Sequence, residues 1–167
     1  MSQVLKKEAW SVLADSAKNF GFVATAQDTD NYARLWSRDS AIASLAVLSH
    51  GKEELYPAVK SSVLNLLEAV GEGGVFPSNA SFDNDGKRTG QSYGGPVGRT
   101  DSPFWWAITA LSYMEVVQDF SIKDAVAGAI EEIERRAQAW EFNNKHLMYS
   151  PASSNWADEY PVEGYIL

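Results

Sequence analysis

The segment that most constrains the fold runs from Ser37 to Ser49. It reads "SRDSAIASLAVLS", and its apolar residues are distributed around almost the whole circumference of a helix. A helix that is apolar nearly all round is stable only when other elements cover most of its sides. Hydrophobic residues make up 45% of the chain and charged residues 22%, which is typical of a globular domain. We therefore expect a domain built around this helix.

Other segments show the apolar periodicity of helices at residues 3–18, 53–70, 102–120 and 121–139. Ser102-Pro103 begins one of them, with proline in the first turn. We predict a long ordered loop at 71–100, a loop with a short hairpin at 140–160, and the opening of a sixth helix in the last residues. These elements predict an all-α single domain over residues 1–167. The apolar pattern is still running at Leu167, so we expect a fragment of a larger protein.

Charge and composition exclude several classes of function. The net charge is −8 and the pI is about 4.7, with no basic cluster, which argues against nucleic acid and anionic membranes as partners. No apolar run is long enough to cross a bilayer. The chain has no cysteine, and its N-terminus lacks the apolar core of a signal peptide, so we expect a cytoplasmic protein. His50 and His146 form no metal-binding spacing, and no phosphate-binding glycine motif is present, so we expect no metal and no cofactor.

Three clusters of polar and aromatic residues stand out, each just before an expected helix: "YARLWSRD", "VGRTDSPFWW" and "SSNWADEYP". They precede every second helix. In a ring of helical hairpins, the loops that enter alternate helices open on one face. Tryptophan, arginine and carboxylate side chains would meet there. Aromatic faces stack on sugar rings, and charged forks bind hydroxyl groups, so this composition indicates a sugar-binding crater.

Three longer stretches resemble a known family. "GFVATAQDTDNYARLWSRDSAI" is similar to the start of the six-hairpin glycosidases, especially bacterial glucoamylases, and "GRTDSPFWWAITAL" is similar to their second block and to a neutral-invertase block. "NWADEYPVEGYIL" resembles the block that carries the general acid. The resemblance implies about half of a six-hairpin α/α toroid. It also implies a glycoside hydrolase acting on glucose-configured oligosaccharides with two carboxylates.

The resemblance also implies roles for individual residues. Arg38 and Asp39 match the pair that holds the hydroxyls of the sugar, and Arg99 and Asp101 match the pair of the second block. The tryptophans of the three blocks would stack on the sugar or line the crater; these are Trp36, Trp105, Trp106 and Trp156.

The third block would supply the general acid. Asp158 aligns with the neutral-invertase acid, and Glu159 follows it. Glucoamylases carry the acid directly after the tryptophan, where this chain has Ala157, so both carboxylates stay candidates and we favour Asp158. The second catalytic carboxylate of the family lies beyond the matched blocks. We therefore expect this chain to be catalytically incomplete alone. Half a ring would leave apolar helix edges open, which a homodimer could cover.

Structural roles are the alternative for each of these residues. Arg38-Asp39 can be a buried ion pair at a helix start, and Asp101 can be a helix N-cap. Asp158-Glu159 can be a solvated pair in a loop. Trp105 and Trp106 are adjacent on a helix, so at least one belongs to the core. At the level of the whole chain, the alternatives are a non-catalytic carbohydrate-binding half-barrel and an all-α protein-interaction module.

Overall fold

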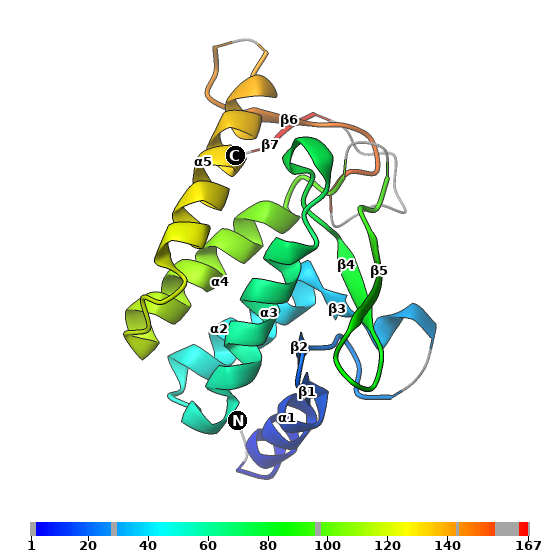
Figure 1. The fold of residues 1–167 in the computed structure, drawn as a ribbon, viewed down its shortest axis with the longest axis vertical. Helices are drawn as coiled ribbons and strands as arrows, with labels where there is room; N and C mark the ends of the chain where they lie inside the picture. Colours follow the sequence, from blue (N-terminus) through cyan, green and yellow to red (C-terminus); the bar gives the residue numbers. More distant parts are fainter. Residues whose placement is uncertain (1–2, 28–29, 96–97, 143, 156–163, 167) are drawn as a thin grey trace.

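The computed structural model describes residues 3–27, 30–95, 98–142, 144–155 and 164–166. In these ranges the α-helices are α1 (Gln3–Ser16), α2 (Ser37–Ser49), α3 (Tyr56–Glu68), α4 (Ser102–Val117) and α5 (Lys123–Ala139). The strands are β1 (Ala17–Lys18), β2 (Gly21–Phe22), β3 (Leu35–Trp36), β4 (Asn79–Phe82), β5 (Arg88–Ser92), β6 (Met148–Ser150) and β7 (Gly164–Ile166). Figure 1 shows α2, α3, α4 and α5 packed together, with the β4–β5 ribbon beside them.

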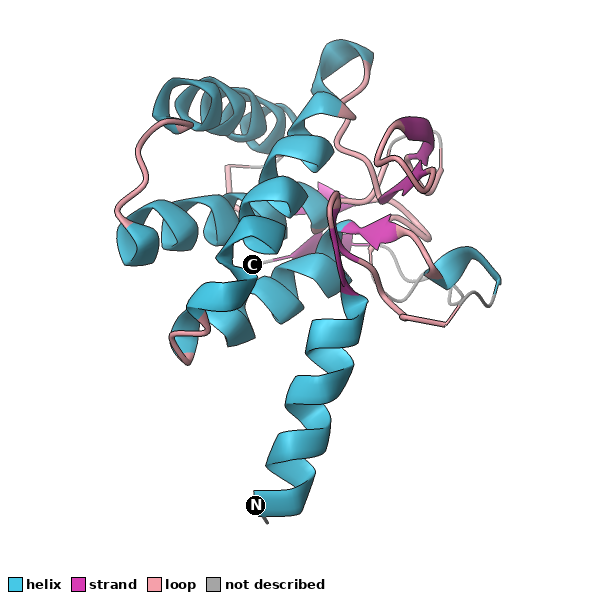
Figure 2. Ribbon diagram, turned by 60° about the horizontal axis from the view of Figure 1, so that its bottom comes forward, coloured by secondary structure: helices cyan, strands magenta, loops and turns pink. Residues whose placement is uncertain are grey.

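The five helices lie where the apolar periodicity predicts them. α2 has the predicted bounds, and α4 begins at Ser102, with Pro103 in its first turn. The first helix is shorter than predicted, because the chain leaves it after Ser16 and turns into the small β1–β2 hairpin. Figure 2 shows α1 projecting from the rest of the molecule. No helix in the described ranges combines the length and the apolar character needed to span a membrane.

The all-α prediction is wrong, and the half six-hairpin toroid that rested on it is not the observed fold. The described residues form a mixed α/β structure with three small antiparallel sheets. Within 71–100, predicted as a loop, β4 and β5 form a hairpin, and β4 also pairs with β3. The turn is held by the Asp83 carboxylate, which accepts the backbone N–H groups of Asp85 and Lys87 at 3.1 and 2.9 Å.

The predicted sixth helix is also absent from the described part of the C-terminal segment. Residues 164–166 form β7, which pairs antiparallel with β6. Gly164 has a φ of 146°, a conformation outside the helical region that glycine adopts at low cost. A hairpin was predicted within 140–160; in the described part of that range the structure has one strand, β6, and its partner β7 comes later in the chain.

The core lies between α2, α3, α4 and α5. Trp106 of α4 packs against Phe76 with ring centroids 5.3 Å apart, and its indole N–H donates to the backbone carbonyl of Val63 at 2.8 Å. The face of α2 that is buried consists mainly of small residues: Ser37, Ser40, Ala41 and Ser44, with Val47 and Leu48 at its end. Small side chains let α2 and α4 approach closely. Ile42, on another side of α2, is 53% exposed, so the helix is less enclosed than its sequence predicts.

Candidate functional site

The candidate site lies where α2 and α4 begin. α2 is anchored there by Ser37, whose backbone N–H donates to the Ser78 carbonyl at 2.9 Å and whose hydroxyl donates to the Pro77 carbonyl at 2.6 Å. Ser37 is fully buried, so both bonds lie out of water. The start of α2 is thereby attached to the segment that leads into β4. This attachment fixes where Trp36 and Arg38, the neighbours of Ser37, project.

Arg38 and Asp101 form an ion pair across the site. The Arg38 Nη1 lies 3.3 Å from the Asp101 Oδ2, and the two side chains are 35% and 18% exposed. The first and second sequence blocks therefore meet in space, 63 positions apart in the chain. Arg38 thus pairs with Asp101, while its neighbour Asp39 is exposed in the first turn of α2. A partly exposed pair of this kind contributes little to stability, about 1 kcal/mol or less.

Asp101 occupies the N-cap position of α4 without capping it. Its side chain makes no hydrogen bond to the first-turn N–H groups. The carboxylate instead meets Arg38 with one oxygen. Its other oxygen, Oδ1, is buried and has no hydrogen-bond partner among the described residues. A buried acceptor without a partner costs free energy, so this carboxylate retains capacity for a hydrogen-bond donor.

Trp36 and Asp39 border the same polar pocket. The indole N–H of Trp36 donates to the Asn31 carbonyl at 3.0 Å, and Tyr32 stacks on the ring at a centroid distance of 5.8 Å. Asp39 is exposed in the first turn of α2. The pocket has a volume of about 40 Å³, and its lining residues are Trp36, Arg38, Asp39, Ser78, Arg99, Ser102 and Asn155. This volume accommodates hydroxyl groups from one face of a ligand and not a whole ring.

Arg99 completes the polar pocket and holds the C-terminal segment against it. Its guanidinium donates to the backbone carbonyls of Ser153 and Asn155. Its Nε lies so close to Gly94 that a Cβ at that position would overlap it. Gly94 has a φ of 74°, which also favours glycine. Gly94 therefore makes room for Arg99.

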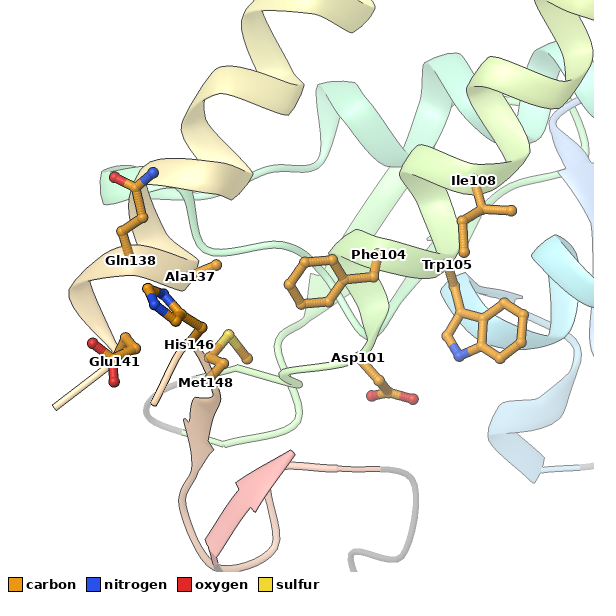
Figure 3. Close-up of a pocket in the computed structure, with 9 residues that line it drawn as sticks. All are labelled: Asp101, Phe104, Trp105, Ile108, Ala137, Gln138, Glu141, His146 and Met148. Atoms are coloured by element: carbon orange, nitrogen blue, oxygen red, sulfur yellow. The ribbon is translucent and has the colours of Figure 1, made fainter. Parts of the chain in front are cut away.

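The two adjacent tryptophans of α4 have different environments. Trp106 is 1% exposed in the core, so a sugar bound at the polar pocket cannot reach it in this structure. Trp105 is partly exposed and lines a larger cavity beside Asp101, as Figure 3 shows. One tryptophan faces the core and the other faces a cavity, as their adjacency on a helix requires.

The lining of the larger cavity includes residues that were not predicted from the sequence. It has a volume of about 640 Å³ and lies between the start of α4, the end of α5 and β6. Phe104 and Ile108 line it, on the side of α4 that also carries Trp105. The signal that could have identified them is their helical spacing: both are large apolar residues, four positions apart, and both are exposed.

The candidate general acids Asp158 and Glu159 lie outside the described residues, as does Trp156. Of the third block, the structure describes the segment up to Asn155 and residues 164–166. Thr100 fixes that segment next to the second block: its backbone N–H and its hydroxyl both donate to the Ser154 carbonyl, at 2.6 and 2.9 Å. The described beginning of the third block thus lies beside Asp101.

Comparison with models of known protein families gives no match, and a search of curated proteins likewise finds none.

Proposed function

We propose that this chain is the sugar-binding part of a glycoside hydrolase that acts on glucose-configured oligosaccharides. The observation that carries the proposal is the Arg38–Asp101 pair, which unites two blocks distant in sequence at one polar pocket. Arginine and carboxylate groups together supply the donors and acceptors that sugar hydroxyls need. The resemblance of both blocks to six-hairpin glycosidases supports the choice of a sugar over other polyols.

Each residue of the pocket has a separate task in this proposal. Asp39 accepts hydrogen bonds from hydroxyls. Arg38 donates to hydroxyl oxygens while it holds Asp101 in place. Trp36, kept in position by its bond to Asn31, offers an aromatic face to the sugar ring.

Hydrolysis requires a general acid and a second carboxylate on the other side of the glycosidic bond. We assign the acid to Asp158 or Glu159, from the resemblance of the third block. The same resemblance places the second carboxylate outside the three matched blocks.

The test is a titration of intrinsic tryptophan fluorescence with glucose, maltose, sucrose and trehalose. Asp39→Ala is the informative variant, because the side chain is exposed and lines the polar pocket. Asp124→Ala is its matched control, since Asp124 is also an exposed acid in the first turn of a helix. We expect saturable binding of at least one sugar, a loss of about tenfold in affinity in Asp39→Ala, and no change in Asp124→Ala.

Two results would contradict the proposal. One is the absence of saturable binding with every sugar of the panel. The other is equal weakening in both variants, which would show that the effect comes from removing negative charge at a helix start and not from the pocket.

A further inference from the structure

The cavity beside the polar pocket has the character of a small-molecule site. Its volume of about 640 Å³ lies within the range of about 300–1,000 Å³ that is usual for such sites. Phe104, Trp105 and Ile108 form one wall, and Ala137 and Met148 form the opposite wall. Two aromatic rings and three aliphatic or thioether side chains make it suited to an apolar, flat group.

The charges around the cavity restrict its ligand further. Asp101 and Glu141 are the carboxylic residues of its lining, Gln138 and His146 are its other polar residues, and no lysine or arginine lines it within the described ranges. An anionic group would therefore be repelled. A neutral aromatic group meets no such penalty, because Trp105 and Phe104 provide faces and edges for ring packing.

Asp101 connects this cavity to the polar pocket. Its carboxylate lines the cavity and, through Oδ2, is paired with Arg38, which lines the pocket. The next residue, Ser102, lines the pocket itself. A ligand with a polyhydroxylated half and an apolar half can therefore place one half on each side of Asp101.

We propose that the cavity binds a neutral aromatic or similarly apolar aglycone of a glycoside whose sugar directs hydroxyl groups into the polar pocket. The link to a sugar rests on the proposed function above. The apolar site itself does not, because it follows from the lining of the cavity alone. The proposed substrate is thus an aryl glycoside or a close analogue. It carries an apolar group that an oligosaccharide lacks.

The first arm of the test examines the cavity without any sugar. The probe is N-phenyl-1-naphthylamine, a neutral dye whose fluorescence rises in apolar surroundings. Ile108→Ser removes part of the apolar wall, and Val116→Ser is its matched control: both are branched residues of α4, exposed by 48% and 47%, and Val116 lies outside the cavity lining. We expect binding about tenfold weaker in Ile108→Ser and unchanged in Val116→Ser and Asp39→Ala.

The second arm of the test asks whether one ligand binds to the cavity and the polar pocket together. Calorimetry compares 4-nitrophenyl glucoside with methyl glucoside, each as both anomers. We expect the aryl glucoside to bind about tenfold more tightly than the methyl glucoside, with the advantage lost in Ile108→Ser and kept in Val116→Ser. If the dye binds as predicted and neither glucoside binds, the proposed function fails while the apolar site stands.

Three outcomes would overturn the inference. In the first, the dye does not bind, or it binds equally well to Ile108→Ser. In the second, both glucosides bind with equal affinity. In the third, sedimentation shows a dimer and dye binding falls as the dimer forms, which would mean that a second copy of the chain covers the cavity.

Discussion

A single glycine determines how Arg99 can lie in the polar pocket. Gly94 has a positive φ, and its missing side chain leaves the space that the Arg99 Nε occupies. In the sequence, Gly94 lies within the long ordered loop predicted at 71–100, and nothing there pointed to its contact with Arg99. Arg99 itself was predicted as a site residue, and the structure places it in the lining of the polar pocket.

Gly94→Ala should weaken sugar binding as well as stability. An alanine at positive φ costs about 1 kcal/mol, and its Cβ displaces Arg99. Gly51→Ala is the matched control, because Gly51 has a φ of 62° and nothing lies within 4 Å of its would-be Cβ. Urea unfolding should show a loss in both variants, larger in Gly94→Ala, and sugar titration should show a loss only in Gly94→Ala. Equal affinities in the two variants would contradict this role of Gly94.

At the scale of elements, the helices were predictable and the hairpins were not. α2 and α4 have long apolar patterns and clear starts, so periodicity located both ends of α2 and the start of α4, while α4 ends three residues before the predicted end. β5 is "RTGQS", a short polar strand with a glycine, and it carries no alternating apolar pattern. The available signal was the Asp85-Gly86 pair, which is typical of a tight turn between two strands. The polar pocket needs both kinds of element, because Ser78 before β4 forms part of its lining.

Ser37 connects α2 to the segment that leads into the β4–β5 hairpin, through two hydrogen bonds. Ser37→Ala leaves the buried Pro77 carbonyl without its hydroxyl donor, which should lower the free energy of unfolding by about 1–3 kcal/mol. Ser49→Ala is the control, because its hydroxyl also donates to a backbone carbonyl of α2 but is exposed. Urea unfolding should detect a change below about 0.5 kcal/mol in the control. A similar loss of unfolding free energy in both variants would show that the buried hydrogen bond of Ser37 stabilises the fold no more than the exposed one of Ser49.

Across the whole molecule, one carboxylate joins three structural parts. Asp119, between α4 and α5, accepts a hydrogen bond from Lys60 of α3 at 2.7 Å and another from the Tyr113 hydroxyl of α4 at 2.8 Å. The bond from Lys60, followed by those from Ser121 and Tyr113, holds the pKa of Asp119 well below its usual range. Burial, together with the bond to Asp119, raises the pKa of Tyr113.

These shifts predict how stability changes with pH. The folded state keeps Asp119 ionised at pH values where the unfolded chain, with a pKa near 3.8, already binds a proton. The stabilisation is complete above about pH 5 and is lost as the pH falls below 4. Asp119→Asn should be less stable at pH 7 and should show a shallower loss of stability between pH 5 and pH 2. Asp85→Asn, in an exposed turn, should show the same dependence of stability on pH as the original protein.

Urea unfolding at several pH values measures this difference. Parallel acid-induced losses in the original protein and in Asp119→Asn would contradict the assigned role. The same linkage has the opposite direction for Tyr113: its neutral form is favoured in the folded state, so its contribution is present below about pH 10 and is lost at higher pH.

The separation of the pocket residues along the chain has a consequence for biosynthesis. Trp36 and Arg38 leave the ribosome early, Arg99 and Asp101 leave later, and Asn155 leaves near the end of the described residues. The nascent chain can form α2 and α3 while Arg38 still lacks its acidic partner. The polar pocket is therefore among the last parts of the protein to be completed, and a ribosome that stalls before Asn155 would display a partly folded helical chain without a finished binding site.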